Sequence, residues 1–214
     1  MPINNAFVHI PRTGGTTVHD CLGKYATNRP DHEFLGKDAR IKYHGYFLYT
    51  FMRNPYTRMI SCYESQFPRE LNHYHLPNED DHITFDRYIE VIIEGQHDDA
   101  EHFQHWRPQT DWIFGDNEVV VNYIGHTETM GRDINEIARL ISVDEIIEPL
   151  VEREYDIIPR TNRPSFIEPF KFKPTHINSS TWRYEDYKDY YNDDTRKKVE
   201  KYYERDLDFL KVKF

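Results

Sequence analysis

A glycine-rich turn near the N-terminus has residue types that can hold a phosphate group. The apolar run Phe7–Ile10 predicts a strand, and Gly14 and Gly15 follow it at the start of a helical pattern. Backbone N–H groups in such a turn, with the positive end of the next helix behind them, bind an anion without a metal. The nucleoside-triphosphate loop has a lysine before its hydroxyl residue, whereas the cation here, Arg12, precedes the glycines. The turn therefore predicts a phosphate loop of another kind.

A second strand-to-helix corner repeats this arrangement. The aromatic run 46–52 predicts a strand, Arg53 follows it, and Pro55 suits a first helical turn. Ser61 lies about two helical turns beyond Arg53, so a guanidinium and a hydroxyl can face the same end of the sheet. Two anion sites at neighbouring strand ends indicate a nucleotide with phosphates at both ends.

The hydrophobic periodicity predicts an α/β protein. Strands that alternate with helices imply a parallel sheet covered on both faces, and its ligands bind at the carboxyl ends of the strands, where both motifs fall. No repeat or linker divides the chain. We expect strands at 5–10, 46–52 and 118–123, and helices at 15–25, 55–66, 84–94, 101–114, 130–141 and 192–206.

The two corners resemble motifs of the sulfotransferases. Pro11–Thr17 is similar to the loop that binds the 5′-phosphosulfate of the donor, and Arg53 with Ser61 matches the 3′-phosphate motif, spacing included. Further blocks resemble the carbohydrate branch, which contains chondroitin and heparan sulfate enzymes, and they lie at 102–112, 123–130 and 199–209. The resemblance implies one sulfotransferase domain, residues 1–214, with a three-layer P-loop-like fold.

The activity implied is transfer of a sulfuryl group from 3′-phosphoadenosine-5′-phosphosulfate (PAPS) to a hydroxyl, expected on a carbohydrate, without a metal. Such a transfer needs positioning and charge neutralisation more than covalent help. The resemblance places Arg12 at the leaving group, where relatives usually have lysine; arginine keeps the charge but does not readily give up a proton. The donor-binding residues implied are Arg12, Thr13, Gly14, Gly15, Thr16, Thr17, Arg53 and Ser61, with Lys173, Asn178 and Ser179 from a loop, 171–180, that resembles the family's cofactor-covering segment.

The resemblance also implies a base, and we expect it to be His44. This residue precedes the second predicted strand, where heparan-type relatives carry a catalytic histidine, and an imidazole accepts a proton near neutral pH. Some relatives have His-Gly-His, with the catalytic role on the second histidine, and here Tyr46 stands in that place. A structural role and an acceptor contact stay open for His44.

Residues of the predicted helix 101–114 are candidates for the acceptor groove, with helix packing as the alternative. An arginine suits an acidic sugar and a tryptophan suits a sugar ring; the candidates are His105, Trp106, Arg107 and Gln109. His102 and His105 lie three residues apart but lack a metal-binding signature, so we expect no metal. Glu128 follows a strand end, where it either anchors a helix or faces the cleft.

Composition excludes several classes of protein. The net charge of −10, from 37 acidic and 27 basic residues, argues against binding to nucleic acid or to an anionic membrane. The N-terminal residues lack the pattern of a signal peptide, so we expect a cytoplasmic protein. Animal members of the family that it resembles usually have an N-terminal membrane anchor, so the resemblance implies a bacterial or viral type. Cys21 and Cys62 are expected to be buried thiols. No feature predicts an oligomeric state.

Two other functions remain open. A nucleotide-dependent kinase of P-loop type would explain one phosphate loop but not the absent loop lysine or the pair Arg53 and Ser61. A noncatalytic nucleotide- or glycan-binding module would keep the loops and the aromatic residues without a base.

Overall fold

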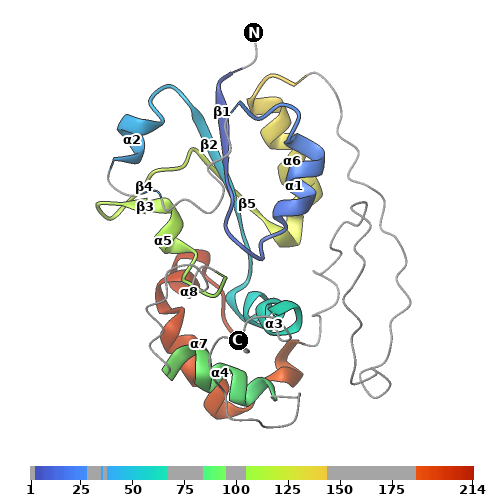
Figure 1. Ribbon diagram of the computed structural model, residues 1–214, viewed down its shortest axis with the longest axis vertical. Coiled ribbons are helices and arrows are strands. Elements are labelled where there is room, and N and C mark those ends of the chain that lie inside the picture. The colour runs from blue at the N-terminus through green and yellow to red at the C-terminus, as the bar shows by residue number, and fades with distance from the viewer. Residues whose placement is uncertain (1–2, 28–34, 36–37, 67–83, 95–104, 144–186) are drawn as a thin grey trace, which may run out of the picture.

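A three-stranded parallel sheet forms the centre of the fold. The computed structural model describes residues 3–27, 35, 38–66, 84–94, 105–143 and 187–214 (Figure 1). Strands β1 (Asn5–Val8), β2 (Phe47–Met52) and β5 (Tyr123–His126) lie in the order β1-β2-β5, and both neighbouring pairs are parallel. The predicted α/β class with a parallel central sheet is confirmed.

Helices accompany the sheet along the chain. Their bounds are α1 Gly15–Leu22, α2 Ala39–Lys42, α3 Pro55–Gln66, α4 Phe85–Glu94, α5 Thr110–Ile113, α6 Met130–Leu140, α7 Asp193–Tyr202 and α8 Glu204–Leu210. Short 3₁₀ turns occupy Thr127–Thr129 and Tyr187–Tyr190, and a hairpin joins β3 (Phe114–Gly115) to β4 (Glu118–Val119).

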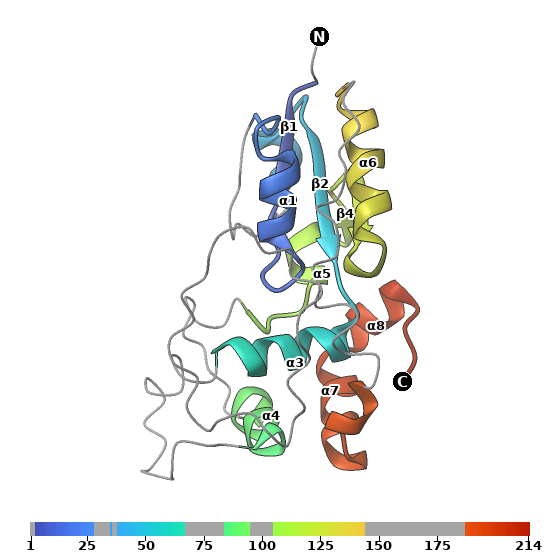
Figure 2. The same cartoon turned by 90° about the vertical axis from the view of Figure 1, so that its right-hand side faces the viewer.

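Successive side chains of a strand point to opposite faces of the sheet, and each face packs in its own core. Phe7 packs in one core with residues of α1 and α6, whereas Ala6 and Val8 pack in another with residues of α2. Figure 2 shows α1 and α6 side by side on the same face of the sheet. The strands are accordingly mostly apolar, as expected of a sheet covered on both sides, and the polar residues Asn5 and Thr50 are themselves buried.

A further apolar core lies beyond the carboxyl end of the sheet, where α3, α4, α7 and α8 gather (Figure 1). Tyr56 of α3 contacts the rings of Tyr187, Tyr191 and Phe214 at centroid separations of 5.0–5.8 Å. Many of the chain's aromatic residues therefore fill this core.

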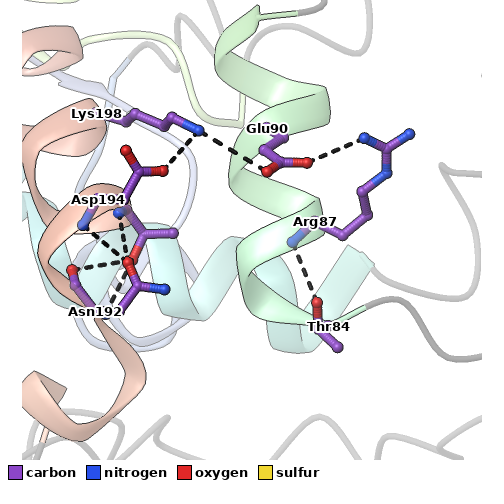
Figure 3. A network of polar contacts seen from close by, with 7 residues as sticks. Thr84, Arg87, Glu90, Asn192, Asp194 and Lys198 are labelled. Carbon is purple, nitrogen blue, oxygen red and sulfur yellow. Dashed lines mark hydrogen bonds and ion pairs between the residues drawn. The ribbon is translucent and has the colours of Figure 1, made fainter.

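Polar contacts join α4 to α7 on the outside of this core (Figure 3). Lys198 lies 2.9 Å from Asp194 on its own helix and 3.9 Å from Glu90 of α4. Asn192 caps α7, because its side chain accepts hydrogen bonds from the N–H groups of Asp194 and Thr195. These exposed ion pairs each contribute little to stability, so the core and the cap hold the helix in place.

Three element predictions were wrong. The segment 105–109 is not helical, and only Thr110–Ile113 of the predicted helix 101–114 is α5. The strand predicted at 118–123 is the hairpin arm β4, which a turn with positive φ at Asp116 and Asn117 joins to β3, followed by a separate β5. The last predicted helix, 192–206, breaks at Tyr203 into α7 and α8.

A buried carboxylate fixes the corner between β5 and α6. Asp133 is 1% exposed, and its oxygens accept hydrogen bonds from the His126 N–H (2.8 Å), the Thr129 hydroxyl (2.7 Å) and the Arg132 guanidinium (2.9 Å). Burial raises the pKa of Asp133, but these three donors outweigh that effect, so its pKa lies below the ordinary value. The carboxylate is therefore stabilised in the folded state.

We expect Asp133→Asn to lower the free energy of unfolding by about 1–3 kcal/mol near neutral pH, because an amide leaves donors unsatisfied. The folded pKa lies below the unfolded value of about 3.9, so the carboxylate's contribution is complete above that value and is lost as the pH falls through the folded pKa. Urea denaturation should show that the difference in free energy of unfolding between wild type and variant becomes smaller below about pH 4. A gap independent of pH would contradict this role.

Candidate functional site

The turn between β1 and α1 adopts the backbone that an anion loop requires. Arg12 and Gly14 have positive φ, 69° and 83°, and α1 begins immediately afterwards at Gly15. Gly14 is the N-cap of α1 and provides no side-chain cap, and the first turn contains no acidic residue. The first N–H groups and the positive end of the helix dipole therefore meet no competing carboxylate on that turn, which suits them to an anion.

The three threonines of the loop have different surroundings. Thr13 is fully buried, and its hydroxyl donates to the Ile10 carbonyl at 2.8 Å, so this side chain holds the turn itself. Thr16 is exposed. Thr17 is 2% exposed, and its Oγ1 has no hydrogen-bond partner among the residues that the structure describes. A buried hydroxyl in this position is costly unless a further group satisfies it, and a bound anion is one group that could do so.

Two neighbouring side chains leave no room for a Cβ in the loop. A Cβ at Gly15 would lie 1.9 Å from Nε2 of His9, and one at Gly14 would lie 2.2 Å from Cε of Met130. The His9 ring in turn stacks on Phe7, with ring centroids 5.5 Å apart. The side chain of His9, just after β1, and that of Met130, at the start of α6, therefore both pack against the loop; at Gly14 the positive φ of 83° disfavours a side chain as well.

The second corner is built by Asn54 and Pro55. The Asn54 side chain accepts from the Tyr56 N–H at 2.9 Å and so caps the start of α3, whose first residue is Pro55. The Asn54 N–H donates to Oε1 of Glu128 at 2.9 Å. Glu128 thus acts as an anchor for the corner, one of the two roles expected for it.

The structure brings Arg12, Arg53 and Ser61 together. The Arg12 Nε and Nη2 atoms donate to Oγ of Ser61 at 3.2 and 2.8 Å, and Nη1 of Arg53 approaches the Arg12 carbonyl at 3.4 Å. Ser61 and Arg53 are 3% and 2% exposed. The two predicted phosphate sites, far apart in sequence, are therefore direct neighbours at the carboxyl end of the sheet.

Arg58 holds the same region together from inside. It is fully buried, and its guanidinium donates to the carbonyls of Pro11 (3.0 Å), His105 (2.8 Å) and Arg107 (2.8 Å). Within the described part of the chain, no carboxylate lies within salt-bridge distance of Arg12 or Arg58. Neither charge is therefore neutralised by a described carboxylate, although the chain carries a net charge of −10; Arg58, whose donors are all engaged, can act on an anion only through its field.

The structure does not place His44 with these residues. His44 is exposed and lies before the first residue of β2, whereas Arg53 follows the last. The six residues of β2 span roughly 20 Å at about 3.3 Å per residue. His44 therefore lies at the opposite end of the sheet from the phosphate loops, a placement that does not fit its predicted role as base.

Burial also contradicts two of the predicted acceptor contacts. Trp106 is 1% exposed and Gln109 fully buried, so neither side chain offers a surface to a sugar. The Trp106 carbonyl accepts the Tyr203 hydroxyl, and the His105 carbonyl accepts from Arg58 and Cys62. The segment 105–109 is non-helical because its backbone groups bond to side chains of α3 and of the C-terminal region. Trp106 and Gln109 serve packing, which was the alternative expected for them.

Arg107 and the remaining predictions have other outcomes. Arg107 is about one-third exposed and pairs with Asp111 at 3.1 Å. Lys173, Asn178, Ser179 and His102 lie outside the described residues. Cys21 and Cys62 are both buried.

Among the described residues, no group of three or more His, Cys, Asp or Glu side chains is arranged to hold a metal, and no helix is long and apolar enough to cross a membrane.

Sequence reasoning missed three contributors to the site. His9 lies just before the glycine loop, Asp206 lies in the block 199–209 without a role assigned to it, and Gln109 was expected to contact the acceptor. Asp206 is fully buried in α8 and accepts from Gln109 and Thr110, and the Gln109 side chain bonds to the backbone of Arg53. An aspartate among apolar positions of an amphipathic helix is a signal of a buried partner, but only the fold identifies that partner.

A comparison with protein-family models matches the sulfotransferase family over residues 6–212. The chain belongs to the sulfotransferase family. Searches of curated proteins and of solved structures found no match. The family model spans nearly the whole chain, so it includes both phosphate corners and the C-terminal helices. Transfer of a sulfuryl group to a hydroxyl acceptor is the reaction of this family.

The contact between His9 and Gly15 gives a test of the loop's packing. We expect Gly15→Ala to lower the free energy of unfolding by about 1–3 kcal/mol, because the new methyl group overlaps the His9 ring. In a His9→Ala background this cost should largely disappear, as urea denaturation of the double-mutant cycle would reveal.

Gly45→Ala is the matched control for this cycle. Unlike Gly15, Gly45 has positive φ, 81°, but nothing lies within 4 Å of the position that an added methyl group would take. Its cost should come from backbone strain alone and should be the same with or without the His9 ring. An equal cost of Gly15→Ala in both backgrounds would refute the steric account.

Proposed function

We propose that this sulfotransferase uses PAPS as its donor and transfers the sulfuryl group to a carbohydrate hydroxyl without a metal. The observation that carries the proposal is the meeting of Arg12, Ser61 and Arg53 beside an uncapped helix N-terminus. Two adjacent anion sites suit a nucleotide that bears a 5′-phosphosulfate and a 3′-phosphate. A P-loop-like relationship of the sheet and loop is part of the same proposal.

The described residues fit such a donor. The N–H groups at the start of α1 and the Thr17 hydroxyl, buried with no partner among the described residues, are suited to the 5′-phosphosulfate. Arg53 and Ser61 are suited to the 3′-phosphate. PAPS would supply an activated sulfuryl group whose leaving group is a phosphate.

The work of the protein in this proposal is positioning and charge neutralisation. The loop N–H groups and the Arg12 guanidinium lie where negative charge would gather on the leaving phosphate, and donors fixed in advance need no reorganisation. Arg12 stays protonated, so it stabilises charge and gives up no proton. Gripping the nucleotide at both ends would prevent it from sliding along the loop.

Lys173, Asn178 and Ser179 remain proposed contributors to donor binding on the resemblance alone. The proposal does not include His44 as the base, because it lies at the other end of the sheet. Arg107 and His105 remain proposed acceptor contacts, since each is partly exposed and each has its carbonyl held by the Arg58 guanidinium. The carbohydrate acceptor rests on the resemblance of the blocks 102–112, 123–130 and 199–209 to the carbohydrate branch.

The test is transfer of ³⁵S from labelled PAPS to a panel of glycans in the presence of a chelator. We expect transfer by the wild type and a loss of about 10- to 100-fold or more in kcat/KM with Arg53→Ala, because a charge-assisted contact is removed. Arg139→Ala is the control, since Arg139 is an exposed arginine on α6 whose ion pair in the described part of the chain is with Glu136. It should retain wild-type transfer.

Other outcomes identify other functions. Metal-dependent transfer of phosphate from labelled ATP, with no transfer from PAPS, would replace the proposal with a kinase. Binding of PAPS or its product without any transfer of label would indicate a noncatalytic module. Transfer from PAPS only to small alcohols or peptides would keep the donor and refute the carbohydrate acceptor.

A further inference from the structure

The backbone of Arg53 is held by a side chain. Oε1 of Gln109 accepts from the Arg53 N–H at 2.9 Å, and Nε2 of Gln109 donates to the Arg53 carbonyl at 2.8 Å. The pair of bonds resembles the exchange between facing residues of two strands, and it occurs one residue after β2 ends at Met52. Gln109 thus extends the ordered backbone to the arginine that follows the strand.

A carboxylate from the C-terminal helix determines which way the Gln109 amide faces. Asp206 Oδ2 accepts from the Gln109 N–H at 2.7 Å and from Nε2 at 3.3 Å, and Oδ1 accepts from the Thr110 N–H at 2.8 Å and hydroxyl at 2.7 Å. An ionised carboxylate has no hydrogen to donate, so the NH₂ end of the amide must face it. The oxygen end then faces the Arg53 N–H.

The connection is buried along its length. Asp206, Gln109 and Thr110 are all 0% exposed, and Arg53 is 2% exposed. Water does not compete for these hydrogen bonds, so each has a defined geometry, and the loss of one acceptor leaves donors unsatisfied. A change at Asp206 is therefore transmitted to Arg53 through one intervening side chain.

The guanidinium end of Arg53 points toward the glycine loop between β1 and α1. Its Nε donates to Oγ1 of Thr57 at 3.0 Å, and its Nη1 approaches the Arg12 carbonyl at 3.4 Å. With the backbone fixed by Gln109 at one end and the guanidinium by Thr57 at the other, the side chain has one orientation. That orientation places Nη1 beside the Arg12 carbonyl, and the Arg12 side chain in turn donates to Ser61.

We propose that Gln109 and Asp206 are positioning residues for recognition of the donor's 3′-phosphate: Asp206 orients the Gln109 amide, which fixes the backbone of Arg53. This inference rests on the proposed function, in which Arg53 binds that phosphate. Asp206 lies in α8, more than 150 residues beyond the loop between β1 and α1 in sequence. In this proposal, α8 therefore contributes to the specificity for the nucleotide.

The experiment compares two nucleotides by calorimetry. Adenosine 3′,5′-bisphosphate contains the 3′-phosphate and adenosine 5′-phosphate lacks it, so the ratio of their Kd values isolates recognition of that group. In Asp206→Asn and in Gln109→Met we expect the preference for the bisphosphate to fall about 10- to 100-fold, while the affinity for adenosine 5′-phosphate changes less than about threefold. A general loss of structure would weaken both nucleotides alike.

Thr110→Val is the matched control. It removes one hydrogen bond to Oδ1 of the same carboxylate and leaves the contacts of Oδ2 with Gln109 in place. Its stability to urea should fall, but its preference for the bisphosphate should equal that of the wild type. A preference reduced as far as in Gln109→Met would contradict the proposal.

The remaining outcomes separate this inference from the proposed function. Folded Asp206→Asn and Gln109→Met variants with the wild-type preference would overturn the positioning role and leave PAPS as the donor. Loss of the folded state in both would overturn it too, because the two residues would then serve the fold alone. A wild type without preference for the bisphosphate would refute the donor itself.

Discussion

The arrangement of the site depends on the hydrogen bonds of one buried side chain, the guanidinium of Arg58 in α3. Its three hydrogen bonds, to the carbonyls of Pro11, His105 and Arg107, join α3 to the loop between β1 and α1 and to the segment before α5. Arginine suits this task because its planar fork offers several donors in fixed directions and stays charged when buried. These donors satisfy three backbone carbonyls and connect the loop before α1 to the segment before α5 through α3.

The electrostatics of the site follow from this connection. Arg58 adds a positive charge directly beneath the loop, and Arg12 adds another at its rim, whereas the chain as a whole is acidic. Charge in a buried cation is costly without compensation, and here carbonyl dipoles supply part of it. An anionic nucleotide would supply the rest. Local field, more than net charge, therefore governs which ligand binds at the end of the sheet.

The parts of the fold that follow from local sequence were predictable. The glycine turn, the Arg53 and Ser61 spacing, and the starts of α1, α3 and α6 depend on residues close in sequence, and the structure places these elements within a few residues of their predicted bounds. The family follows from the same motifs. Elements of this kind are specified by periodicity, capping and turn chemistry.

Features that depend on contacts between distant residues were not predictable. Residues 105–109 looked helical and groove-lining, but their carbonyls and amides bond to Arg58 and Asp206, and this tertiary bonding overrides local propensity. His44 looked catalytic by resemblance, whereas only the direction of β2 reveals that it lies at the other end of the sheet. The hairpin turn at Asp116 and Asn117 depends on positive φ at two residues, a turn signal that hydrophobic periodicity does not register.

The central claim is that two neighbouring anion sites hold the two ends of one nucleotide. The most direct measurement is ³¹P NMR of adenosine 3′,5′-bisphosphate titrated with the protein. We predict that the 3′- and 5′-phosphate resonances both shift and saturate at one equivalent, and that Arg53→Ala abolishes the shift of the 3′ resonance while the 5′ resonance still moves. A wild-type titration in which only one phosphate resonance shifts, or neither, would contradict the account.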